Sequence, residues 1–508
     1  MLPITNAGKL MLRKKAGFIF LGLSTQLGGI VYPGSVSAAI DTKCGGSIYL
    51  AVKQTWNSSI RKYIAVDKIE IHMKREGDVY PLYDIQSYLY NFYRMASRCG
   101  DHELLNQIAE TLLPIFDLAI QEKGEVKWVC RGGTHCTTKN GLLGKEIQLN
   151  TLQFLGLASA LAAKLAHSDD ANLSPSSREF VTKASDSAYR FVARMAKNKN
   201  YVKSLEMNRQ ESPGDPRRNP ASKVLRDHEI WMLTILANLA GTTANGQLFK
   251  REAFPDEDVK KLSNELLELF YSRTHVTGNL GSGEATAEID RGFWSYHKDN
   301  QFAGYTANSL PADLCKRSEL QKYNPSGKVQ ESAQIKRMPP VPQNLGWDIS
   351  HARRLVPLFD SFSDYREQMS HLYALPIEKL DGDLKGAYAQ QLIKNIWNQD
   401  EKRPLFKNYW SGANGWYRVG FKGGGKCTQG YPPFGLSIAV PTGGYFTWAA
   451  KNAKLAELGA SLYSLTSDKN EEASAFMEKN YRGLSRKATQ RTRELNQFMF
   501  YPTLVGVQ

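Results

Sequence analysis

A set of long helical patterns, some apolar on nearly every side, constrains the fold of this chain more than any other feature. Residues 146–165 read EIQLNTLQFLGLASALAAKL, and after the first turn almost every side chain is apolar or small. Such a helix needs protein around it on most sides. Residues 174–195 and 256–271 instead carry apolar residues on one face, as helices that cover a core do. The sequence therefore predicts buried helices enclosed by amphipathic ones.

Further helical patterns follow along the rest of the chain. They occupy residues 84–98, 102–121, 224–239, 346–363, 384–397, 445–465, 471–484 and 487–497. The chain thus holds about twelve helices and few of the alternating stretches that strands show. Long irregular connections are expected at 199–222 and 310–344, the second as a loop that covers a cavity. We predict one all-α domain over residues 40–508, with a helical-repeat solenoid as the alternative, although no fixed sequence period supports it.

The first 39 residues have the three-part order of a secretory signal peptide. Lys9, Arg13, Lys14 and Lys15 precede the apolar run AGFIFLGLSTQLGGIV, and the small residues SVSAA follow. We expect cleavage near Ala39, which makes the mature chain secreted or periplasmic. An uncleaved anchor is the alternative, but the apolar run is shorter than the ~20 residues that a spanning helix needs. No later stretch suggests stable membrane insertion.

All six cysteines follow the predicted signal peptide, so an oxidising compartment would allow three disulfides. Cys130 and Cys136 flank RGGTH and are expected to close one short loop. A metal site formed by Cys130, His135 and Cys136 is the alternative, but no second close Cys/His pair accompanies them. We predict neither a metal nor a cofactor.

The formal net charge of +15 favours acidic partners such as uronate polysaccharides. Nucleic acid is not predicted as a partner, because no zinc finger, RNA-binding signature or long Lys/Arg run is present. The chain also lacks G-x-S-x-G, a Walker-type phosphate loop, H-E-x-x-H and paired C-x-x-C motifs. These absences argue against an α/β hydrolase, a nucleotide enzyme and a zincin.

The stretch 285–305, ATAEIDRGFWSYHKDNQFAGY, concentrates polar and aromatic groups at helical spacing. If it is a helix, one stripe holds Asp290, Trp294, His297 and Gln301, and Tyr296 lies on the neighbouring stripe. We interpret the polar stripe as the lining of a cavity. The alternative is a core helix whose polar groups are satisfied inside the protein.

Two shorter clusters combine acids, bases and cations. The first is Arg226-Asp227-His228-Glu229 with Trp231, at the start of an apolar helix, where Asp227 could instead be a charge favoured by the helix dipole. The second is GWDISHARR, which places Trp347, Asp348, His351 and Arg354 near one helical face. Here the alternative is that Asp348 caps a helix and His351 is its capping partner.

A fourth cluster is the region 408–446, which is rich in glycine and aromatic residues. Its candidate sugar-stacking rings are Trp410, Trp416, Tyr417 and Tyr431. Packing of a long loop onto the core would use the same rings.

The alternation of buried and one-faced helices, together with the aromatic patches, resembles the (α/α) toroid of carbohydrate-active enzymes. The resemblance covers most of residues 40–508 and rests on architecture, without a signature motif. It implies an (α/α)6-type toroid, complete or incomplete, with long loops over one face and a substrate groove across the mouth of the inner helices. Fold alone does not establish function.

Three functions fit these residues. A glycoside hydrolase acting on a polysaccharide would use Asp290 and Asp348 as its pair of carboxyls, with Glu229 or Asp227 as substitutes. A polysaccharide lyase would use a base, an acid and a cation that neutralises the uronate carboxylate. The candidate base is His351 or His297. The candidate acid is Tyr296 or Tyr417, and the candidate cation is Arg291 or Arg354. A non-catalytic glycan-binding protein would need only the aromatic groove. The sequence favours the hydrolase, with an acidic glycan as substrate.

Overall fold

The computed structural model of the protein describes residues 40–122, 124–210, 225–244, 256–291, 303–305, 345–380, 383–418, 422–423, 426–427 and 430–507. Residues 1–39, with the predicted signal peptide, lie outside them. The described part is all-α, and its short strands form antiparallel pairs. These pairs are β1 (Ile120–Glu122) with β2 (Glu125–Lys127), β3 (Thr274–Thr277) with β4 (Thr286–Ile289), β5 (Ala303–Tyr305) with β6 (Trp416–Tyr417), and β7 (Lys422–Gly423) with β8 (Lys426–Cys427).

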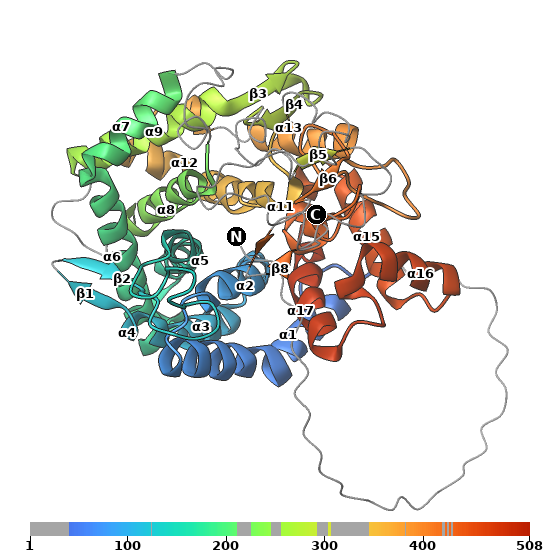
Figure 1. Cartoon of the computed structure of the whole chain (residues 1–508), viewed down its shortest axis with the longest axis horizontal. Coiled ribbons are helices and arrows are strands. Elements are labelled where there is room, and N and C mark those ends of the chain that lie inside the picture. Colours follow the sequence, from blue (N-terminus) through green and yellow to red (C-terminus); the bar gives the residue numbers. More distant parts are fainter. Residues whose placement is uncertain are drawn as a thin grey trace, which may run out of the picture.

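Four helices lie at the centre of the molecule (Figure 1). They are α2 (Pro81–Arg98), α5 (Gln148–Ala166), α8 (Asp227–Ala244) and α12 (Leu355–Tyr373). Nearly every residue of α5 and α8 is buried, as their apolar sequences predict. By length and composition α5 could cross a membrane, but 89% of its most apolar window is buried inside the protein, as in the core helix of a soluble protein.

The central helices run parallel to one another. Gly156 early in α5 lies against the ring of Trp231 early in α8, because a Cβ on Gly156 would come within 2.4 Å of that ring. At the other ends, His167 Nε2 lies 2.9 Å from the carbonyl of Gly241. Neighbours near both the starts and the ends mean that the two helices have the same direction.

The other central helices share this direction. Arg353, just before α12, donates to Tyr83 in the first turn of α2, whereas Arg94 near the end of α2 pairs with Asp360 further along α12. Tyr93 of α2 donates to the carbonyl of Ala160 in the second half of α5. The amino ends of the central helices therefore lie on one side of the molecule.

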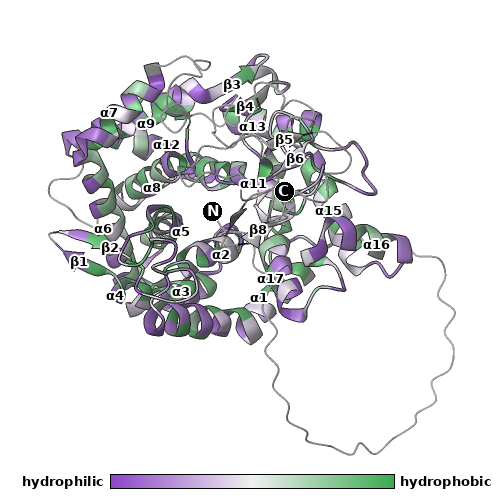
Figure 2. Ribbon diagram, viewed as in Figure 1, coloured by the Kyte–Doolittle hydropathy of each residue, from purple (hydrophilic) through white to green (hydrophobic). Residues whose placement is uncertain are grey.

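An outer set of helices surrounds the centre and returns the chain between the parallel ones (Figure 1). It comprises α1 (Ser47–Thr55), η1 (Trp56–Ile60), η2 (Tyr63–Arg75), α3 (His102–Leu112), α4 (Pro114–Asp117), α6 (Pro175–Lys197), α7 (Lys199–Gln210), α9 (Glu257–Arg273), α13 (Asp383–Gln391) and η10 (Leu392–Ile396). Outer helices such as α6 bury one face and expose the other, whereas the central helix α8 is mostly hydrophobic (Figure 2). Ser174 and Asp256 cap the starts of α6 and α9, with side chains that accept N–H groups of the first turn.

The C-terminal part of the chain packs against the start of this assembly. It contains α11 (Ile349–Ala352), which precedes α12, and then α14 (Ala439–Thr442), η11 (Tyr445–Ala450), α15 (Lys454–Ser467), α16 (Glu471–Asn480), η12 (Arg482–Leu484), α17 (Gln490–Phe500) and η13 (Tyr501–Leu504). The remaining short 3-10 turns are η3 (Asp170–Asn172), η5 (Leu280–Ser282) and η9 (Ile377–Leu380). Helix α17 packs on α2, where Trp56, Phe92 and Phe498 form an aromatic cluster.

The helix predicted over residues 285–305 is wrong in its described part. Residues Thr286–Ile289 form β4, and Asp290 has a φ of 47°, which a right-handed helix does not allow. Burial alternates here with the two-residue period of a strand: Ala285, Ala287 and Ile289 are buried, and the residues between them are less buried. Asp290 therefore does not begin a helical stripe, and Trp294 and His297 lie outside the described residues.

Other boundaries also differ from the prediction. The pattern over 102–121 is interrupted at Pro114 and ends in β1, and the pattern over 445–465 is divided into η11 and α15. Residues 199–210 form α7 instead of a loop, and the helical run from α1 to η2 was not predicted. The helices predicted at 84–98, 146–165, 174–195, 224–239 and 256–271 are confirmed within a few residues.

Two disulfides are present in the described part of the chain. Cys130 and Cys136 close the short loop that the sequence predicts, which rules out the alternative metal site because both thiols are bonded to each other. Cys44 is joined to Cys99, just after α2, and the nearby Gly506 N–H donates to the carbonyl of Thr42 at 2.9 Å. Cys315 lies outside the described residues.

Candidate active site

The amino ends of α2, α8 and α12 meet at a cluster of basic, acidic and phenolic side chains. The first N–H groups of a helix have no partner within the helix, and its amino end carries a partial positive charge. In an antiparallel bundle the dipoles of neighbouring helices oppose one another. Here they point the same way, so their positive ends reinforce one another on the side where the cluster lies.

Tyr83 and Arg353 form the first contact of the cluster. Arg353 Nη2 donates to the Tyr83 hydroxyl at 2.6 Å and lies 3.3 Å from Ser87 Oγ, so the phenol oxygen is held from α2 and the cation from the start of α12. Burial alone would raise the pKa of Tyr83, but the charges of Arg353 and Arg354 lower the pKa below its usual value. The phenol is therefore a stronger acid than an ordinary tyrosine.

His351 and Asp348 form the second contact. Asp348 caps α11, where one of its oxygens accepts the N–H groups of Ser350 and His351 at 3.0 and 3.1 Å. Its other oxygen lies 2.5 Å from His351 Nδ1, which places the imidazole proton on Nδ1 and the lone pair on Nε2. Burial lowers the pKa of His351 although Asp348 opposes this, so the ring is neutral near pH 7. The capping alternative is thus correct for Asp348, and the cap also orients the histidine.

Tyr417 lies beside this histidine. Its hydroxyl is 3.4 Å from His351 Nδ1, and Arg418 lies over its ring at 5.2 Å. Backbone hydrogen bonds in both directions, of 2.9 and 2.7 Å, pair Tyr417 with Tyr431. Burial raises the pKa of Tyr417 well above its usual value, so this phenol gives up its proton less readily than Tyr83.

Asp227 connects α8 to the same cluster. Its two carboxylate oxygens lie 3.7 Å from Arg354 Nη2 and 3.6 Å from His228 Nδ1. Burial would raise the pKa of Asp227, but His228 and Arg354 hold the pKa below its usual range. Arg354 Nη1 also donates to the carbonyl of Ser350 at 2.6 Å, so its guanidinium joins α8 to α11.

No family model, curated protein or solved structure matches the chain. Function therefore has to be inferred from the chemistry of these side chains.

The structure gathers only some of the residues that the sequence proposes. Asp227, His228, Asp348, His351, Arg354, Tyr417 and Tyr431 belong to the cluster through the contacts described above. Trp294, Tyr296 and His297 lie outside the described residues. Arg291 is exposed and pairs with Glu288 at 2.7 Å.

The predicted tryptophans divide by burial. Trp231, Trp347 and Trp410 are each no more than 1% exposed. The indole N–H of Trp410 donates to the carbonyl of Ala287, and its ring stacks on Tyr445, which is the core packing weighed as the alternative for this region. Trp416 is half-buried, so it and Tyr431 are the better candidates for a sugar contact.

Glu229 and Asp290 hold the chain in place at the start of α8. Glu229 is fully buried, accepts the backbone N–H of Arg226 at 2.8 Å and pairs with that guanidinium at 2.6 Å, as a glutamate in a helix-capping box does. Asp290 accepts the N–H of Leu225 at 2.8 Å and faces Arg273 at 3.9 Å. Among the described residues, Asp290 and Asp348 share no hydrogen-bond partner.

Two members of the cluster, Tyr83 and Arg353, were not predicted. Arg353 lies next to Arg354 in HARR, but the predicted helical face contains only Arg354 of these two arginines. Pro81 is typical of the first turn of a helix, so it marks the start of α2 two residues before Tyr83. No local sequence pattern shows that α12 begins beside Tyr83.

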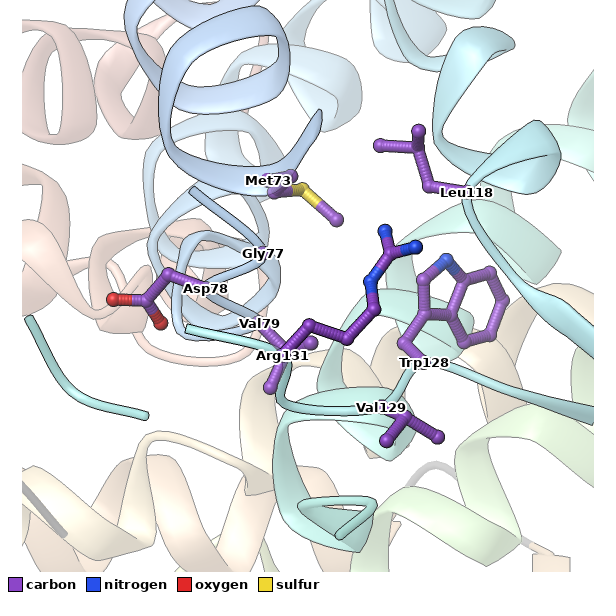
Figure 3. A pocket seen from close by; sticks show the side chains of 8 residues that line it. All are labelled: Met73, Gly77, Asp78, Val79, Leu118, Trp128, Val129 and Arg131. Atoms are coloured by element: carbon purple, nitrogen blue, oxygen red, sulfur yellow. The ribbon is translucent and has the colours of Figure 1, made fainter. Parts of the chain in front are cut away.

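A small pocket lies near the start of α2 but is less suited to chemistry (Figure 3). Its lining is Met73, Gly77, Asp78, Val79, Leu118, Trp128, Val129 and Arg131. The Asp78 carboxylate points away from it and lies 2.8 Å from His135 Nδ1. Arg131 extends beside Trp128 there.

The buried carboxyl of Asp290 gives a testable pH dependence. Burial raises the pKa of Asp290 from its ordinary 3.8 to about 7. The folded protein thus keeps a proton that the unfolded chain loses, so this contribution to stability is complete below pH 3.8 and is lost as the pH rises through about 7. Its slope is at most about 1.4 kcal/mol per pH unit. Asp290→Asn should remove that slope, as measured by urea unfolding at several pH values. An unchanged slope in the variant would contradict the assignment.

Proposed function

We propose that the protein is a secreted or periplasmic polysaccharide lyase that cleaves an acidic, uronate-containing glycan. The observation that carries the proposal is the cluster of Tyr83, His351, Asp348, Arg353 and Arg354 at the amino ends of the parallel central helices. It combines a neutral, oriented imidazole, an acidified phenol and two arginines in a positive field. Those are the groups that elimination beside a carboxylate requires.

The proposal includes an (α/α) toroid, complete or incomplete, as the fold of residues 40–508. Four parallel helices at the centre, each linked to the next through outer helices, support it. In that arrangement the amino ends of the inner helices form the floor of the substrate groove. The two disulfides support a compartment outside the cytoplasm.

Each member of the cluster has a role in the proposed elimination. Arg353 and Arg354 neutralise the uronate carboxylate, which makes the proton alpha to it more acidic. His351 Nε2 takes that proton, and Asp348 stabilises the imidazolium that forms. The electrons of the broken C–H bond form a double bond as the neighbouring C–O bond breaks, and Tyr83 donates its proton to the departing glycosidic oxygen. Proton exchange with water then restores both residues.

A glycoside hydrolase remains the second candidate because of one observation. The pKa of Asp290 is about 7, so this carboxyl is protonated near neutral pH, as a general acid must be. Against this role, Asp290 is only 1% exposed, and one of its oxygens already accepts from Leu225. Asp348, its predicted partner, is bonded to Ser350 and His351.

The purified protein should be incubated with a panel of acidic and neutral polysaccharides, and both new reducing ends and ultraviolet absorbance should be followed. We expect both signals on an acidic glycan, because elimination leaves a double bond conjugated with the carboxylate. Reducing ends without absorbance would indicate the hydrolase. Binding without either signal would indicate a non-catalytic glycan-binding protein, and each of these two results would overturn the lyase proposal.

A further inference from the structure

Three arginines lie together where η12 meets α17, outside the candidate active site. We call Arg482, Arg486 and Arg493 the arginine surface. Arg493 Nη1 donates to the carbonyl of Arg486 at 3.1 Å. Gly483, next to Arg482, packs so closely against α17 that a Cβ would come within 2.7 Å of Asn496 Nδ2. Arg482 and Arg486 are exposed, and the segment is strongly hydrophilic (Figure 2).

The charge of this surface is not neutralised by the described part of the protein. No carboxylate there pairs with any of the three arginines. Arg486 and Arg493 are instead held by backbone carbonyls, since Arg486 Nη2 donates to Ser467 at the end of α15 at 2.5 Å. A carbonyl fixes a guanidinium without cancelling its charge. Other arginines do have acidic partners, as in the pairs of half-buried Arg190 with Asp186 and of exposed Arg403 with Glu472.

Two of the neighbouring cations are balanced by acids. Lys487 pairs with Glu478 at 2.6 Å, and Arg491 lies 3.6 Å from Glu494. The positive excess of this region therefore resides on the three arginines and on the exposed Lys479, which has no ion pair in the described part of the chain. Because backbone carbonyls hold Arg486 and Arg493, these two side chains lose less conformational entropy when they bind an anion.

We propose that the arginine surface binds a second stretch of the acidic polysaccharide that the candidate active site cleaves. This inference rests on the proposed function for the identity of the polymer. Guanidinium groups bind carboxylate and sulfate groups through paired hydrogen bonds, and a polyuronate carries such groups at regular intervals along its chain. Attachment at two places would hold the polymer near the site and raise its effective concentration there.

The test compares the wild-type protein with Arg482→Gln/Arg486→Gln/Arg493→Gln. Polygalacturonate and alginate would be the probes, with binding measured by fluorescence anisotropy of labelled polymer at physiological salt. We expect the triple variant to bind the polymer about tenfold more weakly or worse. KM for the polymer should rise with kcat nearly unchanged, and turnover of a uronate trisaccharide, too short to reach both places, should stay the same.

A matched control removes three positive charges from paired arginines elsewhere: Arg75→Gln/Arg190→Gln/Arg403→Gln. Equal loss of polymer binding in both triple variants would overturn the proposal, because net charge would then explain it. If the arginine-surface variant lost binding to single-stranded DNA but kept binding to polyuronate, the surface would bind nucleic acid instead, and the proposal would be overturned. The binding measurement does not require turnover. Absence of lyase activity would therefore refute the proposed function but would not affect the test of polymer binding.

Discussion

Tyr83→Phe is expected to lower kcat/KM on the acidic glycan by about 10² to 10⁴, because it removes a proton donor from the transition state. The ring stays in place and only the hydroxyl that accepts from Arg353 is lost. A hydrogen bond to a charged group contributes about 1.5 to 3 kcal/mol to stability, so the variant should be less stable but still fold. The measurement is steady-state elimination, followed by absorbance, beside a thermal unfolding curve.

Tyr93→Phe is the matched control for this prediction. Tyr93 belongs to the same helix, and its hydroxyl donates to the carbonyl of Ala160 at 2.9 Å, away from the cluster. Tyr93→Phe should lose about 0.5 to 1.5 kcal/mol of stability, as expected for a hydrogen bond between neutral groups, and keep its activity. The pH profile gives a second readout: activity should fall below the pKa of His351, and the alkaline limb, where Tyr83 loses its proton, should change in Tyr83→Phe. Equal activity of the two variants would refute the role of Tyr83.

Asp360→Ala is expected to destabilise the protein by about 3 to 5 kcal/mol, since it removes the buried counter-charge of Lys385 and one of the two counter-charges of Arg94. Asp360 is 3% exposed and receives contacts from three side chains. Lys385 Nζ lies at 2.9 Å, Arg94 Nε at 3.3 Å and the Tyr90 hydroxyl at 3.3 Å. These contacts join α2, α12 and α13 beyond the amino ends that form the site. Unfolding in urea would measure the change as a lower midpoint with the same slope.

Asp364→Ala controls for the loss of a carboxylate from the same helix. Asp364 also pairs with Arg94, but its side chain is 34% exposed, and exposed pairs contribute about 0 to 1 kcal/mol. The difference between the two variants therefore measures burial. If both variants lost the same stability, the network around Asp360 would not hold the central helices together.

The sequence predicts the secondary structure better than the site. Residues 146–165 could be recognised as a buried helix because their apolar side chains leave no polar face for solvent. The same reasoning failed for residues 285–291, because a short stretch with both acids and aromatics fits a helical period as well as a strand period. The positive φ of Asp290, which ends the strand, has no signal in the residue itself.

The site depends on contacts between distant parts of the chain. Asp348, His351 and Arg354 were found because they lie within seven residues of one another. Tyr83 is 270 residues from Arg353, and only the parallel packing of α2 and α12 brings them together. Side-chain patterns report which face of a helix is buried, but they do not report whether its neighbour runs in the same direction. The sequence alone could therefore not predict that the helix dipoles reinforce one another.

Thr42 and Gly506 are hydrogen-bonded neighbours, and Arg98 donates to the carbonyls of Pro502 and Val505 beside the Cys44–Cys99 disulfide. The segments next to residues 42 and 506 are thus held side by side. A circularly permuted chain could join residue 506 to residue 42 through a short linker and begin instead at the exposed turn of Gly283. It would keep all these contacts, and its new ends would lie beside the strands that lead to Asp290.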